Sequence, residues 1–367
     1  MKVGSRMLAG ADNLRGREGV AAARAYLAPV AVALVGLAAM LIVAASEGLP
    51  LRDPDARYVG SPLALIGVIA LIFLVLDVVP RAWRASRADS GRSYLPELVA
   101  VLRERWLGRR GLVVAASLVS FYVTYLSYRN LKSFVPFVTN GSNHDPALLD
   151  SERWLFLGAD PGKILHDILG TGVSAHVLSA IYLAFLTLVP LSLGFALIWS
   201  SRLRVGVWYV TALSITWLLG ALSYYLIPAL GPVFVEPAVF SSLPETGVTR
   251  LQDALLSHRL EVMADPHATT AVQSVAAFAS LHIAVVFVAA LVAQLVGAAR
   301  WLRLGMWTFL GLTALATVYF GWHYIIDDVA GLAIGAIAVI AGARLTGFEL
   351  RPSLRRAGLA QRSASAT

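Results

Sequence analysis

The sequence predicts an all-α integral membrane protein, a polytopic helical bundle with about eight transmembrane helices. Hydrophobic residues make up 58% of its 367 residues and charged residues only 14%, whereas soluble domains are about half apolar and about a quarter charged. Eight apolar segments meet or approach the roughly 20 residues that a helix needs to cross a hydrocarbon core about 30 Å thick. The chain has no cysteine, which excludes disulfides and zinc–thiolate sites.

The predicted spans are separated by loops of very different lengths. In chain order they are 26–46, 61–80, 111–128, 174–200, 207–230, 277–297, 304–320 and 324–344. The third and the seventh are the shortest. No short apolar run with a small-residue cleavage site precedes the first span, so we expect a retained membrane anchor there rather than a signal peptide.

Arginine and lysine concentrate in alternate flanks of these spans. They crowd the segment before the first span, the loop 81–110, the turns after the fourth and sixth spans, and the tail after the last. Cytoplasmic loops of membrane proteins carry this excess, so we expect a multi-pass cell-membrane protein with both termini in the cytoplasm. The net charge of +8 has the same origin, and nucleic-acid binding is not expected, because no basic stretch is interleaved with aromatic residues.

Two histidines with polar neighbours begin the sixth and eighth spans, at the face opposite the arginines. His323 and Asp327 are four residues apart, which on a helix places them on one face, so that the carboxylate can orient the imidazole. Asp328 points about 100° away and is the poorer partner. His282 stands two residues after Ser280. Since both pairs fall at the same membrane surface, we expect them to form one site.

These residue types indicate phosphate-ester chemistry. A histidine held by a carboxylate can attack phosphorus and form a phosphohistidine, while His282 serves as acid and base. Ser280 can donate a further hydrogen bond. Arg129 and Lys132, at the outer end of the third span, are either ligands that neutralise phosphoryl charge or ordinary flanking charges. No HExxH motif or clustered ligand spacing occurs, so we expect no metal and no other cofactor.

Less specific interpretations stand beside this one. A single histidine at a membrane interface is more often an amphipathic anchor than a catalyst, and only the pairing of two such histidines with polar partners favours catalysis. Asp327 carries particular weight, because a carboxylate near a helix entrance is costly and usually marks function. Asp77, by contrast, has Arg81 one helical turn away, so we expect these two residues to form a local ion pair.

Together these motifs resemble the type-2 phosphatidic acid phosphatase superfamily. The family's proline-serine-x-histidine motif is similar to residues 279–282, with Ala279 in place of proline, and its histidine-x-x-x-aspartate motif fits His323 and Asp327. The resemblance implies a nucleophilic role for His323, support from Asp327 and acid–base catalysis by His282. Where the family expects an arginine six residues before the nucleophile, this chain has Thr317, which removes a phosphate ligand from the family scheme.

The threonine resembles a branch of inositol phosphorylceramide synthase-like inositolphosphotransferases. The stretch TVYFGWHYIID looks like that branch's third motif, and ERWLFLGADPGKIL resembles a segment that precedes its core helices. YLIPALGP looks like its first motif, which adds Tyr225 and Gly231 as phosphate-binding candidates. The resemblance covers roughly 121–343.

The resemblance completes a predicted division of the chain. Residues 1–110 comprise an N-terminal cytoplasmic segment, two extra transmembrane helices and a basic cytoplasmic loop. Residues 111–346 form a six-helix phosphatase-like catalytic domain, and residues 347–367 form a basic, polar cytoplasmic tail.

We therefore expect a membrane lipid phosphatase or phosphotransferase that acts on a lipid-linked phosphate ester at the extracytoplasmic face, with water or an alcohol as acceptor. Two alternatives stay open. One is a phosphatase of polyprenyl or glycerolipid phosphate. The other is a catalytically silent or transporting membrane protein of the same fold, which the replacement of the family proline by Ala279 favours.

Overall fold

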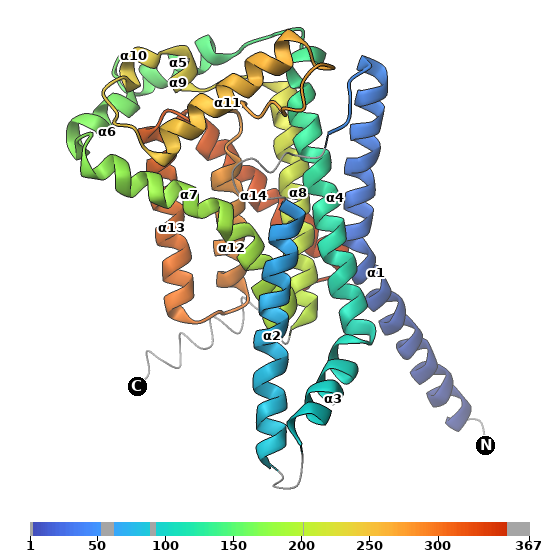
Figure 1. The fold of residues 1–367 in the computed structure, drawn as a ribbon. Helices are drawn as coiled ribbons and strands as arrows, with labels where there is room; N and C mark the ends of the chain where they lie inside the picture. Colours follow the sequence, from blue (N-terminus) through green and yellow to red (C-terminus); the bar gives the residue numbers. More distant parts are fainter. Residues whose placement is uncertain (1–2, 53–61, 89–92, 201, 351–367) are drawn as a thin grey trace.

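A computed structural model describes residues 3–52, 62–88, 93–200 and 202–350, and every regular element in these ranges is a helix (Figure 1). The helices are α1 Val3–Glu47, α2 Pro62–Ala88, α3 Tyr94–Trp106, α4 Arg109–Val138, α5 Asp145–Leu155, α6 Pro161–Leu169, α7 Val173–Leu193, the π-helical turn η1 Gly194–Trp199, α8 Leu203–Leu226, α9 Pro232–Val235, α10 Pro237–Phe240, α11 Gly247–Ala264, α12 Leu281–Leu295, α13 Arg300–Tyr319 and α14 Ile325–Thr346. Seven of these helices are long and apolar enough to cross a membrane. The predicted all-α polytopic class is confirmed.

The sixth predicted span is shorter than the sequence suggested. Of the residues 277–297, only Leu281–Leu295 are helical, about 22 Å of helix at 1.5 Å per residue. The preceding residues are extended and buried in protein. The amide of Ala277 donates to the carbonyl of Ala229 at 2.9 Å, and the amide of Ala279 donates to Ser223 Oγ at 2.9 Å. Their apolar character therefore reflects burial against other parts of the chain rather than a helix in lipid.

The third predicted span, expected among the shortest, is instead the 30-residue helix α4. The run of apolar residues in this helix ends at Tyr128, because Arg129 and Lys132 interrupt it. The helix nevertheless continues for ten residues after Tyr128, and it ends where the amide of Thr139 donates to the carbonyl of Val135 at 3.0 Å. Both cations thus lie inside a helix and not in the loop after it.

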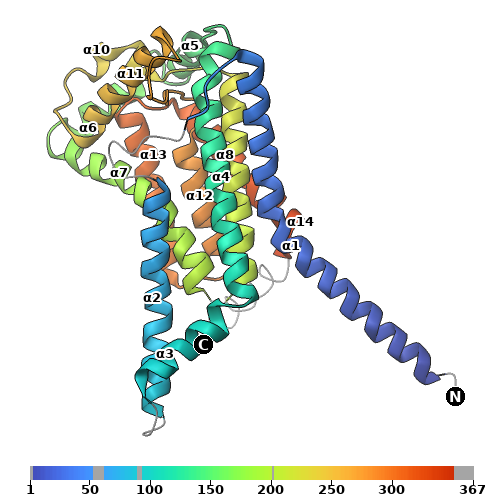
Figure 2. The same ribbon diagram turned by 45° about the vertical axis from the view of Figure 1, so that its right-hand side comes forward.

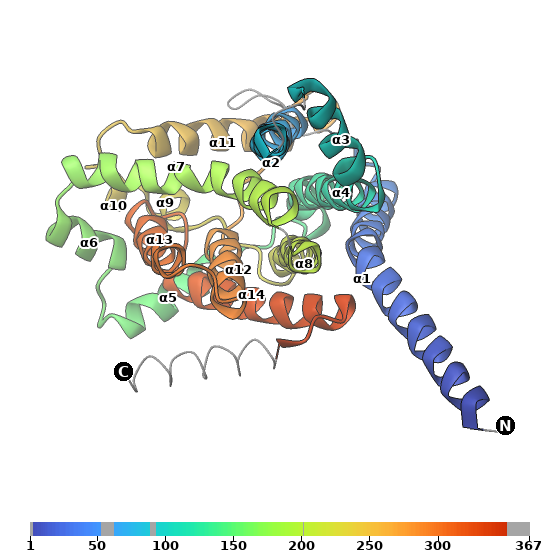
Figure 3. The ribbon, with the colours of Figure 1, turned by 90° about the horizontal axis from the view of Figure 1, so that it is seen from below.

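Helix α8 forms the centre of the bundle. It packs against α1, α4, α12 and α14, and Figure 3, viewed from below, shows these four helices around it. Trp208, Leu213 and Tyr224 of α8 are almost completely buried. Because α1 packs against both α4 and α8, it belongs to the same helix bundle as these later helices. Helix α2 lies further out and contacts α3, α7 and η1.

Short helices cover one end of this bundle, which we call the capped end. Figures 1 and 2 show α5, α6, α9, α10 and α11 gathered there, whereas α3 and the start of α1 lie at the opposite end. Residues 156–160 join α5 to α6, and Pro161 is the first residue of α6. Which end faces the cytoplasm stays a prediction.

Candidate functional site

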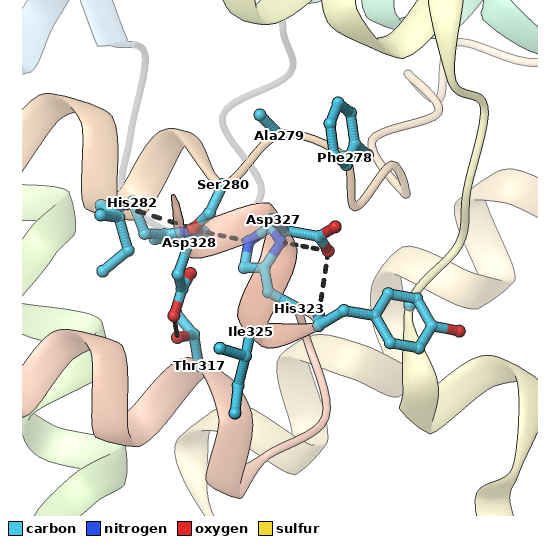
Figure 4. A network of polar contacts seen from close by, with 12 residues as sticks. Phe278, Ala279, Ser280, His282, Thr317, His323, Ile325, Asp327 and Asp328 are labelled. Atoms are coloured by element: carbon cyan, nitrogen blue, oxygen red, sulfur yellow. Dashed lines mark hydrogen bonds and ion pairs between the residues drawn. The ribbon is translucent and has the colours of Figure 1, made fainter. Parts of the chain in front are cut away.

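The two predicted histidines meet at the capped end, although 41 residues separate them in the chain. His282 Nδ1 and His323 Nε2 lie 3.3 Å apart, within hydrogen-bonding distance. Figure 4 shows the two side chains pointing toward one another from the start of α12 and from the loop before α14. This juxtaposition is what a two-histidine mechanism needs, and the sequence by itself did not fix how α12 and α14 pack.

His323 lies in a loop and not on a helix as expected. Helix α14 begins at Ile325, so His323 precedes it by two residues. The turn still brings His323 Nδ1 to 3.6 Å from Asp327 Oδ2, slightly beyond hydrogen-bonding distance. Asp327 Oδ2 also accepts the amide of Tyr324 at 2.9 Å. The carboxylate therefore caps the helix and faces the histidine at once.

Helices α12 and α14 start against each other. The amide of Ser280 donates to the carbonyl of Asp327 at 3.0 Å, which ties the two starts together. Gly331 permits this approach, because a Cβ built on it would lie 2.4 Å from the carbonyl oxygen of Ser280. Two helix N-termini, each with free amides and a positive dipole end, thus converge beside the histidines, a favourable place for an anion.

Ser280, Thr317 and Asp328 form a polar group next to this junction. Ser280 is fully buried and its Oγ caps α12 by accepting the amide of Ile283 at 3.5 Å. Thr317 Oγ1 donates to Asp328 Oδ2 at 3.0 Å. Where the family pattern has an arginine, this chain therefore places a hydroxyl on a carboxylate. Asp328 Oδ1 and Asp327 Oδ1 are buried and have no hydrogen-bond partner among the residues that the structure describes.

Aromatic rings hold His282 in place. Its imidazole lies 4.6 Å, between ring centroids, from both Tyr182 and Phe185 of α7. Trp322, next to His323 in the chain, stacks on Tyr182 at 5.6 Å. The two histidines are thus embedded in an aromatic wall that limits the access of water to them.

Lys132 is the predicted cation that the structure brings near both histidines, since its charge acts on each of them. Its Nζ lies 4.8 Å from the ring centroid of Tyr224 and 6.0 Å from that of Tyr128. It forms no ion pair with a carboxylate in the described part of the chain. A largely buried ammonium without a counter-charge is costly, and a bound anion would supply the missing partner.

The other predicted phosphate ligands have partners within the protein. Arg129 donates to the hydroxyl of Tyr125 at 3.3 Å, and the hydroxyl of Tyr225 donates to the carbonyl of Leu131 at 2.6 Å. The amide of Gly231 donates to Asp145 Oδ1 at 2.9 Å. Gly231 has φ +106°, and a Cβ there would lie 2.5 Å from the carbonyl oxygen of Trp322. Tyr225 and Gly231 thus bind other parts of the protein, and Gly231 sits directly against the chain segment of His323.

The segment 319–325, which we call the histidine loop, is held by helices of the capped end that the sequence analysis did not connect with the site. His166 of α6 donates from Nε2 to the carbonyl of Tyr319 at 2.8 Å, and Gln252 of α11 donates to the carbonyl of Phe320 at 2.7 Å. The amide of Val233 in α9 donates to the carbonyl of Gly321 at 2.9 Å. His166 had no evident partner in the sequence, because a bond to a backbone carbonyl leaves no residue pattern.

Two carboxylates of α5 complete this support. Asp145 is fully buried and accepts the hydroxyl of Tyr324 at 3.0 Å as well as the amide of Leu230 at 2.7 Å. Glu152 Oε1 accepts the amide of Ile325, the first residue of α14, at 2.8 Å. Neither carboxylate was a candidate from the sequence, because no motif or spacing connects either of them with His323.

Burial sets the protonation of the groups around the loop. It lowers the pKa of His323 to about 4; the Asp328 carboxylate opposes this shift and the Lys132 ammonium adds to it. His323 is therefore neutral at physiological pH, the form in which an imidazole nitrogen can act as a nucleophile. Burial also raises the pKa of Glu152 to about 7, against the hydrogen bond from Ile325 and together with the charges of Asp327 and Asp160.

A pocket reaches the histidine loop from the side of α5, α6 and α10. The pocket is open, with about 290 Å³ of empty space when the adjoining solvent is included, and His323, Glu152, Asp160, Glu236 and Phe240 are among its lining residues. Arg153 bridges two of the carboxylates, with 3.0 Å to Asp160 and 2.7 Å to Glu236. Within the described ranges, no group of three or more histidine, aspartate or glutamate side chains is arranged to hold a metal ion.

The comparison with protein-family models identifies one family for this chain. Residues 146–341, more than half of the sequence, match the model of the PAP2 superfamily. The matched region contains both histidines and Asp327, whereas Arg129 and Lys132 precede it. Comparisons with curated proteins and with solved structures found no match.

Proposed function

Because this chain belongs to the PAP2 superfamily, and is thus a phosphatase or phosphotransferase of lipid-type phosphate esters, we propose that it works through a phosphohistidine on His323. The observation that carries this proposal is the 3.3 Å contact between His323 Nε2 and His282 Nδ1, with Asp327 on the far side of the His323 ring. A proton on Nδ1, facing Asp327, leaves the lone pair of His323 on Nε2, which attacks phosphorus when the phosphate enters between the two histidines and replaces their contact.

The reaction proceeds in two displacements. In the first, His323 Nε2 forms a bond to phosphorus and the bond from phosphorus to the leaving alcohol breaks, while His282, which is protonated when the phosphate anion is bound, gives that alcohol its proton and becomes neutral. In the second, His282 takes the proton from water or an accepting alcohol, whose oxygen attacks phosphorus while the phosphorus–nitrogen bond breaks. Lys132 and the N-terminus of α12 stabilise the charge on the phosphoryl oxygens. The remaining predicted ligands contribute by positioning the parts of the protein around the site. They are Ser280, Arg129, Tyr225 and Gly231.

We favour phosphoryl transfer between lipids, of the kind that inositolphosphotransferases perform, and place the site at the extracytoplasmic face. Thr317 in place of an arginine supports that branch, and the arginine-rich flanks at the opposite end support that orientation. Hydrolysis of a polyprenyl or glycerolipid phosphate is the second candidate. The aromatic wall around His282 favours transfer, because it limits the access of water that hydrolysis requires.

A silent or transporting protein is the remaining alternative. Replacement of the family proline by Ala279 is its main support. The structure gives Ala279 a backbone role, since its amide donates to Ser223 Oγ and its side chain is fully buried. That role positions the start of α12 without a group that touches phosphate, so we do not take the replacement as a sign of lost activity.

Product analysis of the purified protein in mixed lipid micelles tests the proposal. The substrates are phosphatidic acid, a polyprenyl phosphate, and phosphatidylinositol with an alcohol acceptor. We expect a new phosphodiester lipid from wild type and a loss of at least about 1000-fold in His323→Ala. His267→Ala, an exposed histidine of the capped end, is the matched control and should behave as wild type. Free phosphate would establish hydrolysis, and equal turnover in His323→Ala would exclude the mechanism.

A further inference from the structure

The two carboxylates of α5 lie on one face of that helix, seven residues apart, and both are directed at the histidine loop. The exposed fraction is 0% for Asp145 and 7% for Glu152. A buried carboxylate is costly unless hydrogen bonds satisfy it. Asp145 accepts three bonds, from the amides of Leu230 and Gly231 and from the hydroxyl of Tyr324. It thereby joins the turn after α8 to the residue that follows His323.

Glu152 holds the other side of the same junction. Its Oε1 accepts the amide of Ile325, one of the amides at the start of α14 that have no partner within the helix. A negative charge at this position also interacts favourably with the dipole of α14. Tyr324 and Ile325, the two residues directly after His323, are thus both bound from α5.

We propose that Asp145 and Glu152 are positioning residues that keep His323 aimed at His282, and that Glu152 makes this arrangement dependent on pH. The inference rests on the proposed function, because it assigns His323 as the group to be aimed. Neither carboxylate is assigned to contact the phosphate. Their effect on turnover passes through the backbone of the histidine loop.

The surroundings of Glu152 explain why its charge responds to pH near neutrality. Asp160 before α6, Glu236 before α10 and His323 line the same pocket as Glu152, the charge of Asp327 in α14 also acts on it, and Arg153 of α5 pairs with Asp160 and Glu236. Burial and these charges raise the pKa of Glu152 to about 7. Glu152 lines the pocket that reaches His323, which gives the buried carboxylate a route for proton exchange. Above pH 7 the carboxylate is ionised and accepts the Ile325 amide more strongly.

Three variants on α5 test the proposal. Glu152→Ala removes the acceptor, and Glu152→Gln keeps a carbonyl oxygen for Ile325 but cannot ionise. Asp150→Asn changes an exposed carboxylate of the same helix and is the matched control. Each variant is compared with wild type as the full chain in detergent, with whichever of phosphatidic acid, polyprenyl phosphate or phosphatidylinositol plus alcohol gives product. Hydrogen exchange of the peptide backbone over 319–327 is measured on the same samples.

We expect Glu152→Ala to lower kcat at least tenfold with KM within twofold of wild type, and to speed exchange over 319–327. In wild type, kcat should rise three- to tenfold as pH increases through about 7. Glu152→Gln should lack this rise and stay at the acidic level of wild type. Unchanged kcat and unchanged exchange in Glu152→Ala would overturn the proposal, as would a wild-type pH rise that persists in Glu152→Gln.

The exchange measurement separates this inference from the proposed function. If wild type turns over none of the three substrates but Glu152→Ala still loosens 319–327 while Asp150→Asn does not, the hold on the loop stands and the proposed activity fails. If wild type is active and His323→Ala is not, but Glu152→Ala equals wild type in both readouts, the proposed activity stands and the positioning role fails.

Discussion

Two polar clusters at opposite ends of the bundle are built around buried carboxylates, and the carboxylates are paired in opposite ways. Asp77 of α2 is paired with Arg81 at 3.1 Å and with Arg105 at 2.6 Å, and Trp106 donates to it at 3.2 Å. Asp327 and Asp328 of α14 face no arginine among the residues described, and each keeps one buried oxygen without a partner. The first cluster is electrostatically complete. The second retains two carboxylate oxygens that no described residue of the protein satisfies.

The contrast indicates which charges serve stability and which serve chemistry. A fully paired carboxylate gains nothing from a substrate, so Asp77 fits a role in joining α2 to α3. Incomplete pairing around His323 is expensive, and it is retained beside two histidines and the unpaired ammonium of Lys132. Charge that is left uncompensated in a buried site is typical of catalytic centres. Substitutions in the two clusters can test this difference, because one cluster should affect stability and the other activity.

The largest expected effect comes from removing each aspartate's charge. Asp327→Asn should lower kcat about 100-fold or more, because the amide no longer favours the Nδ1–H tautomer of His323, while the midpoint of thermal unfolding stays the same or rises. Asp77→Asn should leave kcat within twofold and lower the free energy of unfolding by about 2 kcal/mol, a value reduced because Arg81 is 45% exposed. Turnover and thermal unfolding in detergent measure both. Loss of activity in both variants would contradict the division.

A second, smaller effect separates the cations. Lys132→Met removes the unpaired ammonium near the histidines, and we expect turnover to fall ten- to 100-fold, with the unfolding midpoint unchanged or higher because a buried charge is gone. Arg105→Met should do the reverse and destabilise the protein while it keeps its activity. Inhibition by orthovanadate, a phosphate analogue, gives an independent readout. If Lys132→Met binds vanadate as tightly as wild type, Lys132 is not a phosphate ligand.

The sequence was a good guide where the physics is local. Runs of apolar residues identify the membrane helices, and the four-residue spacing of His323 and Asp327 brings them together even though a turn, and not a helix, carries the histidine. It was a poor guide at 277–280, because apolar residues buried in protein have the same composition as residues buried in lipid. Composition also failed to predict the end of α4, because this helix continues past Arg129 and Lys132.

The support of the histidine loop could not be predicted because it runs through the backbone. Asp145, Glu152, His166 and Gln252 bind amides, carbonyls and one hydroxyl of residues that lie 68 to 179 positions away in the chain. Such contacts impose no spacing and no motif on the sequence. Only the packing of α5, α6 and α11 over the bundle reveals them. The reactive residues of the site could therefore be predicted from the sequence, whereas the residues that hold the histidine loop could not.

The smallest expected effect is the pH dependence of stability, in which the groups around His323 oppose one another. The pKa of His323 is lowered from 6.5 to about 4, so its unfolded state binds more protons between these values and stability falls as pH decreases from 6.5 to 4, by about 3 kcal/mol at most. The pKa of Glu152 is raised from 4.5 to about 7, so stability falls as pH increases from 4.5 to 7. The two terms nearly cancel between pH 4.5 and 6.5 in wild type.

Glu152→Gln should remove the second term and expose a clear loss of stability on acidification, measured as the unfolding midpoint from pH 7 to 4. Equal profiles in wild type and Glu152→Gln would mean that Glu152 does not titrate in this range, and the site would then resemble the complete cluster around Asp77.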